Sequence, residues 1–148
     1  FGLNVFNSLS ANQIDHPILS FELMQSQINN INARGKGMIV YGYLPLMLNR
    51  NCPVKNDIGC FECDKHGRLT DRKGMEFPVM CSDFPCVEML NCHPLYMLDR
   101  LDEVKTDFIH FYFSIECKKQ VEKVIALYEN RGKPDFKYTR GLYQRGTL

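Results

Sequence analysis

The sequence lacks the features that would direct it to a membrane or to secretion. No apolar run approaches the roughly 20 residues that a helix needs to cross a bilayer. Residues 1–5 contain neither a basic region nor a long apolar stretch, so they do not form a signal peptide. We therefore expect a cytoplasmic protein that makes no membrane contact.

An initiator methionine is also missing, because the chain begins with Phe1. Its 148 residues suffice for one domain with a hydrophobic core, and 45% of them are hydrophobic. We expect a fragment or excised domain that works with the remainder of its own longer chain or with a partner subunit.

A marked excess of either charge is absent as well. Lys and Arg together number 18, and Asp and Glu number 17, which leaves a net charge of +1. This balance argues against binding of nucleic acid or anionic membrane over the whole surface, although it leaves room for local basic patches.

One such patch is predicted in the C-terminal tail, where basic and aromatic residues alternate. Arginine pairs with phosphate and tyrosine stacks on unpaired bases, so this segment is a candidate RNA-binding edge. A solvated terminal segment is the alternative interpretation. The candidate residues are Lys137, Tyr138, Arg140, Tyr143 and Arg145.

Cysteine, in contrast, is abundant. The chain has 7 cysteines, most of them between Asn49 and Cys92. An odd number without a secretion signal favours reduced or metal-bound thiols over disulfides. Small buried hydrophobic residues are the alternative role, since free cysteine packs well in a core.

Four cysteines have the spacing of a metal centre. They are Cys52, Cys60, Cys63 and Cys81, in the pattern C-x7-C-x2-C-x17-C. A close pair on a turn and two more distant thiolates can together hold zinc or an iron–sulfur cluster, and spacing alone leaves both open.

The signatures of a peptidase are weak. A His-Glu-x-x-His motif is absent. A cysteine protease needs an activated thiolate near a histidine, for which Cys92 with His93 or His110 is a candidate. Residues adjacent in sequence seldom face each other in the required way.

Two carboxylates follow strand-like segments and are candidate catalytic residues. Glu22 and Glu116 lie where a strand of an α/β barrel would end, which is the face that carries chemistry in such folds. A first-turn acid favoured by the helix dipole is the alternative for each.

Strand-like and helical patterns alternate along the chain, which predicts an α/β fold with a mainly parallel sheet. The segment 68–79 predicts a β-hairpin with its turn at Lys73-Gly74, inside a cysteine-rich insertion over about 49–92. Strands are predicted over 3–6, 17–21, 38–46 and 107–113, and helices over 24–33 and 118–130. Because a complete barrel needs about 250 residues, residues 1–148 are predicted to form a partial (β/α) barrel of the TIM type.

Several strings together resemble the peptidase U32 family, whose members are often described as collagenase-like proteases. The strings are Tyr41-Gly42-Tyr43-Leu44-Pro45-Leu46-Met47 followed by Asn51-Cys52; Leu19-Ser20-Phe21-Glu22-Leu23; Thr70-Asp71-Arg72-Lys73-Gly74 with Phe77-Pro78-Val79; and Thr139-Arg140-Gly141 with Arg145-Gly146. They occur in the family's order over nearly the whole chain. The resemblance implies the C-terminal part of the U32 barrel domain.

The resemblance also implies a cofactor and an activity. Members of the family that act in hydroxylation of RNA or ubiquinone carry a [4Fe–4S] cluster, which by position implies Cys52, Cys60, Cys63 and Cys81 as ligands, with Cys86 as an alternative fourth. The implied function is oxidative modification of RNA or of a small aromatic substrate. Two alternatives remain: proteolysis of peptides or collagen, as the family label states, and a zinc-stabilised RNA-binding module without catalysis.

Overall fold

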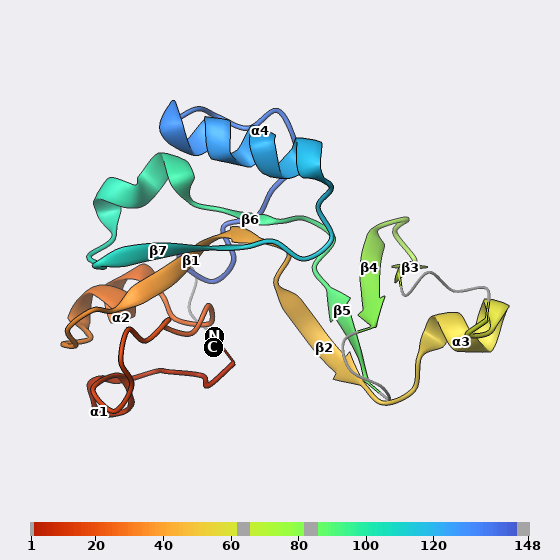
Figure 1. Cartoon of the computed structure of the whole chain (residues 1–148), viewed down its shortest axis with the longest axis horizontal. Helices are drawn as coiled ribbons and strands as arrows, with labels where there is room; N and C mark the ends of the chain where they lie inside the picture. The colour runs from red at the N-terminus through yellow and green to blue at the C-terminus, as the bar shows by residue number, and fades with distance from the viewer. Residues whose placement is uncertain (1, 62–65, 82–85, 145–148) are drawn as a thin grey trace. The chain divides into compact units, whose positions relative to one another are not determined.

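The computed structural model describes residues 2–61, 66–81 and 86–144, and the chain divides into two compact units (Figure 1). Unit 1 combines Phe1–Gly42 with Leu95–Leu148, and unit 2 is Tyr43–Pro94. Unit 2 therefore contains the range 49–92, over which the sequence predicts a cysteine-rich insertion.

Unit 1 is built on a mixed three-stranded sheet in the order β6-β1-β7. The central strand β1 (Gly37–Gly42) is buried along its whole length. It runs parallel to β7 (Phe108–Tyr112) and antiparallel to the short β6 (Leu95–Tyr96). Its burial on both faces explains why residues 38–41 form an uninterrupted apolar run.

The helices of unit 1 begin at local hydrogen-bonding signals. The Asn7 Oδ1 accepts from the Ser10 backbone N–H at 2.9 Å at the start of α1, and the Cys117 N–H donates to Gln120 Oε1 at 2.8 Å before α4. The helices are α1 (Ser8–Ala11), α2 (Gln25–Asn30), the 3-10 helix η1 (Leu98–Glu103) and α4 (Lys118–Glu129). In Figure 1, α4 runs alongside the sheet, where Tyr128 meets the Phe111 ring edge-on at 5.5 Å.

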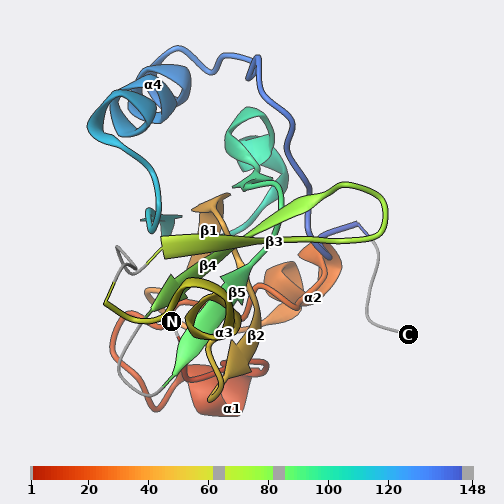
Figure 2. The ribbon, with the colours of Figure 1, turned by 90° about the vertical axis from the view of Figure 1, so that its right-hand side faces the viewer.

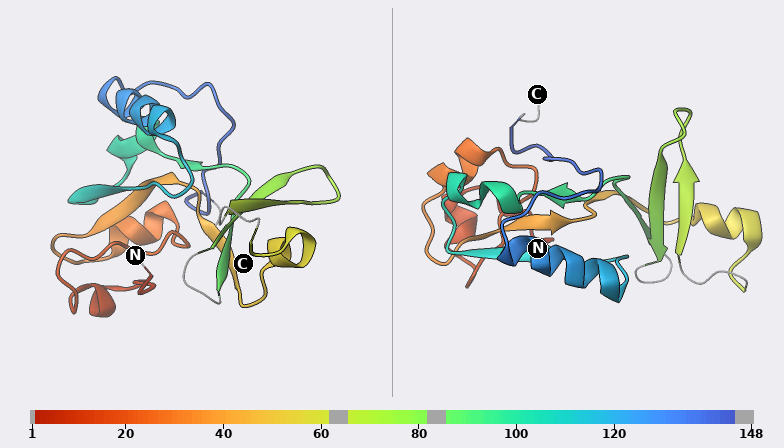
Figure 3. Two further views of the ribbon diagram at one scale, coloured as in Figure 1. Left: turned by 45° about the vertical axis from the view of Figure 1, so that its right-hand side comes forward. Right: turned by 90° about the horizontal axis from the view of Figure 1, so that it is seen from above.

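Unit 2 is an antiparallel four-stranded sheet with one short helix packed on it. The strand order is β2-β5-β4-β3. Figures 2 and 3 show the long β3–β4 hairpin and the helix α3, which contacts β3. The bounds are β2 (Pro45–Asn49), α3 (Pro53–Ile58), β3 (His66–Thr70), β4 (Glu76–Cys81) and β5 (Val87–Leu90).

The predicted hairpin is confirmed. Asp71 Oδ1 accepts from the backbone N–H groups of Lys73 at 2.8 Å and Met75 at 2.9 Å, and Gly74 adopts φ of 75°. An aspartate that satisfies the turn backbone, followed by a glycine with positive φ, explains why the chain reverses here.

The predicted partial (β/α) barrel is wrong. The described residues form two separate sheets, one mixed and one antiparallel, with no closed barrel and with one parallel pair of strands, β1 and β7. The apolar run 38–46, predicted as one strand, divides at Gly42, where φ is 148°, and supplies β1 to one sheet and β2 to the other. The segments 3–6 and 17–21 contribute single parallel bridges, Val5 to Leu19 and Ile18 to Gly37.

Candidate metal centre

Described cysteines lie at one end of the unit 2 sheet, where β2 and β4 finish and β3 and β5 start. The register pairs Asn49, the last residue of β2, with Val87, the first residue of β5. It also pairs Cys81, the last residue of β4, with Val87. Cys86 immediately precedes β5, so it is next to the residue that faces Cys81.

The same end of the sheet receives the helix α3. His66, the first residue of β3, pairs with Met80, one residue before Cys81. Gly67 follows it, and a Cβ atom added to Gly67 would overlap the Val54 side chain of α3. This close approach, which glycine permits, positions α3 over the cysteine-bearing end of the sheet.

Cys52 and Cys60 lie on either side of α3. Cys52 is the residue before Pro53, which is favoured at the first position of a helix because it lacks an N–H. Gly59 ends the helix with φ of 76°, and Cys60 follows directly. A six-residue helix is about 9 Å long, so Cys52 and Cys60 are separated by roughly the length of α3.

The thiols at this end are chemically available as ligands. Cys52, Cys81 and Cys86 are half-buried and Cys60 is exposed, and all four are free of disulfides. Thiolates suit both zinc and iron–sulfur clusters. Cys63, the remaining predicted ligand, lies outside the described residues.

The side chains do not converge on a single point. Among residues 2–61, 66–81 and 86–144, no three His, Cys, Asp or Glu side chains form a group that could hold one metal ion. Of the predicted set, Cys81 ends a strand at this end of the sheet and Cys52 and Cys60 flank the helix that contacts it, and these described thiols do not form a compact three-ligand group.

The residues proposed for thiol proteolysis have other surroundings. The Cys92 thiol donates to the Asn91 side-chain oxygen at 3.5 Å, so its described contact is an amide rather than a histidine. His110 lies in β7 of unit 1, where burial lowers its pKa.

The two candidate catalytic carboxylates also differ in their surroundings. Glu116 Oε2 accepts from the backbone N–H groups of Ser114 at 2.8 Å and Ile115 at 3.1 Å, which stabilises the turn after β7. Its Oε1 and the Ser114 hydroxyl are buried without a hydrogen-bond partner. Glu22 is exposed, and its backbone N–H donates to Ser20 Oγ at 3.3 Å. Neither interaction shows a substrate-binding role.

Two residues of the predicted RNA-binding tail are committed to contacts within unit 1. Arg140 donates to both carboxylate oxygens of Asp99, at 2.6 and 2.8 Å, and to the Tyr96 carbonyl at 2.6 Å. The guanidinium holds the pKa of Asp99 below its usual value.

Tyr143, the second, is 2% exposed, and its hydroxyl donates to the Ile39 carbonyl at 2.7 Å. Burial raises the pKa of this phenol far above its usual range. Its ring is therefore part of the core rather than a surface on which a base could stack. Lys137 and Tyr138 stay predicted RNA contacts, and Arg145 lies outside the described residues.

Sequence reasoning missed Asp99, Gly67 and a cavity in unit 1 that contains His16 and Arg34. Asp99 and Arg140 are far apart in the chain, and their pairing leaves no periodic signal. Gly67 could have been suspected from its position in a strand, because glycine there often marks close approach of another segment.

Comparison with known proteins adds no assignment. No protein-family model, no curated protein and no solved structure matches the chain. In the part of the chain that the structure describes, no helix has the length and apolar character needed for a membrane crossing.

Proposed function

We propose that unit 2 binds a [4Fe–4S] cluster through four cysteines at one end of its antiparallel sheet. The observation that carries this proposal is the common location of Cys52, Cys60, Cys81 and Cys86 around the ends of β2, β4 and β5 and the helix α3. The U32 resemblance implies Cys52, Cys60 and Cys63, with Cys81 or Cys86 as the fourth ligand, and Cys63 lies outside the described residues.

The spread of the thiols favours a cluster over a single zinc ion. Zinc requires four sulfur atoms at about 2.3 Å from one point. A four-iron cluster binds each thiolate at a different corner and therefore accepts ligands that are farther apart. Cys52 and Cys60 lie at opposite ends of α3, and this separation supports the larger cofactor.

We propose, on the same resemblance, that the protein takes part in oxidative modification, such as hydroxylation, of RNA or a small aromatic substrate. Four protein thiolates leave no iron position open, so the cluster would transfer electrons or stabilise unit 2. Proteolysis receives less support, because the Cys92 thiol contacts Asn91 rather than a histidine.

Anaerobic purification followed by absorbance spectroscopy and metal analysis tests the cofactor. We expect a broad band near roughly 400 nm and about four irons and four sulfides per chain. The variant Cys81→Ser should lose the band. Cys117→Ser, which changes an exposed thiol at the start of α4, should retain it.

Other outcomes would reject the proposal. Colourless protein with one zinc per chain supports the zinc-stabilised RNA-binding alternative. Metal-free protein that cleaves peptides, and loses this activity on Cys92→Ser, supports the peptidase. The oxidative role is tested by mass spectrometry of RNA from cells with wild-type or Cys81→Ser protein, where only the wild type should add an oxygen atom.

A further inference from the structure

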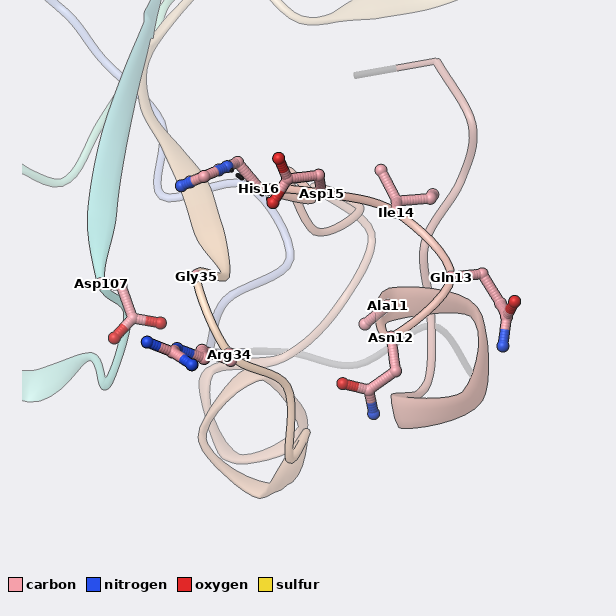
Figure 4. Close-up of a pocket in the computed structure, with 9 residues that line it drawn as sticks. All are labelled: Ala11, Asn12, Gln13, Ile14, Asp15, His16, Arg34, Gly35 and Asp107. Carbon is pink, nitrogen blue, oxygen red and sulfur yellow. Dashed lines mark ion pairs between the residues drawn. The ribbon is translucent and has the colours of Figure 1, made fainter.

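Unit 1 contains a cavity of about 710 Å³ at the end of the sheet where β1 and β7 begin. Figure 4 shows that its walls come from three segments: the loop after α1, the turn before β1, and the residue before β7. The polar lining residues are Asn12, Gln13, Asp15, His16, Arg34 and Asp107. The metal centre proposed for unit 2 involves none of them.

Hydrogen bonds join these walls, so the cavity is preformed. Asn12 Nδ2 donates to the Asn32 carbonyl at 3.1 Å, which ties the first wall to the second. Lys36 N–H donates to Asp107 Oδ2 at 2.9 Å, and Asp107 N–H donates to the Lys36 carbonyl at 2.8 Å, which ties the second to the third. A preformed site avoids much of the ordering cost of binding.

His16 has an unusual backbone at the rim of the cavity. Its φ is 51°, a left-handed value that costs a non-glycine residue energy. Its imidazole lies 3.0 Å from Asp15, Nδ1 to Oδ1, and a Cβ on Gly35 would lie 3.5 Å from its ring. Asp15 therefore already contacts His16, whereas no described residue donates a hydrogen bond to Asp107 Oδ1, although the buried Lys36 ammonium interacts electrostatically with the Asp107 carboxylate.

Arg34 is the complementary group. Figure 4 shows its guanidinium and the Asp107 carboxylate directed toward each other, yet they are too far apart for an ion pair within 4.0 Å. Within the described residues Arg34 has no hydrogen-bond or ion-pair partner, and Asp107 uses only Oδ2. The same cavity is thus lined by Arg34, a cation without an ion-pair partner among the described residues, and by Asp107, whose carboxylate has one oxygen that no described residue occupies; both side chains are exposed.

We propose that this cavity binds a small zwitterion of the class of free α-amino acids. The Arg34 guanidinium would bind the carboxylate through two parallel hydrogen bonds, a geometry that arginine provides and lysine does not. Asp107 Oδ1 would accept from the ammonium group. A ligand with a single charge would satisfy only one of the two groups, so the arrangement selects for molecules that carry both.

Titration of the full ¹⁵N-labelled chain, followed by two-dimensional NMR, tests the proposal with three probes: glycine, acetate and methylammonium. Glycine should cause saturable shifts of the Gly35 and Asp107 amide signals, and the two singly charged probes should bind at least about tenfold more weakly. Arg34→Gln and Asp107→Asn should each weaken glycine binding by at least about tenfold. The control Arg50→Gln, at an exposed site in unit 2, should leave it unchanged.

Three results would overturn the proposal: shifts that do not saturate, acetate binding as tight as glycine binding, or unchanged glycine binding in Arg34→Gln. Arg34 is exposed, and no hydrogen bond or ion pair joins it to another described residue, so its replacement should not affect folding. In Asp107→Asn the side-chain oxygen that accepts from Lys36 is retained. Because the cavity belongs to unit 1, the expected binding holds whether or not the protein contains iron.

Discussion

Lys36 shows at the residue scale how unit 1 accommodates a buried charge. Only 8% of the residue is exposed, and its ammonium donates to the carbonyls of Ile28 at 2.8 Å and Ile31 at 2.6 Å, at the end of α2. Burial lowers its pKa, an effect that nearby Asp107 partly offsets. The side chain gives a donor to the Ile31 carbonyl and a second donor to the Ile28 carbonyl, which also accepts from the Ile31 N–H at 3.3 Å.

We expect Lys36→Met to lower the free energy of unfolding by about 1–3 kcal/mol, because the buried Ile31 carbonyl loses its donor and the Ile28 carbonyl keeps only the longer bond from the Ile31 N–H at 3.3 Å. Urea unfolding followed by circular dichroism measures the change. Lys73→Met is the matched control, since this side chain is exposed at the hairpin tip and its loss should cost less than about 0.5 kcal/mol. Equal losses in the two variants would contradict the capping role.

The Asp99–Arg140 pair predicts an acid-sensitive contribution to stability. The pKa of Asp99 is lower in the folded chain than its usual value, so its stabilisation is complete above the unfolded pKa and is lost as pH falls through the folded pKa. The stability difference between wild type and Asp99→Asn should therefore stay constant down to about pH 5 and shrink as the pH falls below about 4. Urea unfolding at several pH values measures it.

Asp102→Asn is the control for this series. Asp102 pairs with Arg131 at 2.9 Å on the exposed surface, and such pairs contribute less than about 1 kcal/mol. A difference for Asp99→Asn that stays constant with pH would show that its carboxylate does not stabilise the fold through its charge.

At the scale of elements, α3 contacts β3 at Gly67, where the absence of a side chain makes room for Val54. This contact positions the start of α3, where Cys52 lies. Gly67→Ala should displace α3, because the added methyl overlaps Val54, and should destabilise the chain by about 1–3 kcal/mol. The double variant Gly67→Ala with Val54→Ala creates room for the methyl and should recover part of the loss. Urea unfolding of the wild type, the single variant and the double variant measures these changes in stability. If the double variant recovers no stability, α3 does not pack at Gly67.

Elements specified by local signals could be predicted from the sequence. The helix predicted over 118–130 is confirmed as α4, the strand over 107–113 as β7, and the hairpin turn is where Asp71 and Gly74 indicate it. Elements whose boundaries depend on pairing with distant segments could not be predicted from the sequence. Strands β1 and β2 share one apolar run but belong to different sheets, and β6 is too short to show a period.

The same division applies to the candidate sites. The cysteine spacing predicts a metal centre because the residue type carries the chemistry, and the sheet register then groups the thiols at one end. Tyr143 is predicted as an RNA contact because basic and aromatic residues alternate in the C-terminal tail. Its burial follows from a hydrogen bond to Ile39, 104 positions earlier, which the local sequence does not encode.

At the scale of the whole molecule, unit 2 leaves and rejoins unit 1 at neighbouring positions. Gly42 at the end of β1 pairs with Leu95 at the start of β6. Within unit 2, the Asn91 N–H donates to the Leu44 carbonyl at 2.9 Å, so the two connecting segments are also joined. Unit 2 therefore occupies the place of the turn in a β1–β6 hairpin.

We expect that a shortened chain, in which Asn-Gly replaces residues 43–94, folds as unit 1. A two-residue Asn-Gly loop suits antiparallel strands whose terminal residues face each other, as Gly42 and Leu95 do. Its ¹⁵N NMR spectrum should reproduce the dispersed signals of β1, β7 and α4 in the full chain. A collapsed spectrum would show that unit 1 needs unit 2 for its stability.

The joined ends of unit 2 also have a kinetic consequence. Before β6 can meet β1, the chain between Gly42 and Leu95 must close into a loop, and the entropic cost of closure rises with the length of free chain. Strands in unit 2 pair over shorter separations, as β3 with β4 and β4 with β5 do, and such contacts form earlier. Once unit 2 has folded, the Leu44–Asn91 bond shortens the effective loop to a few residues. We therefore expect the strands around the cysteines to pair before β6 completes the unit 1 sheet, so that formation of unit 2 speeds the closure of unit 1.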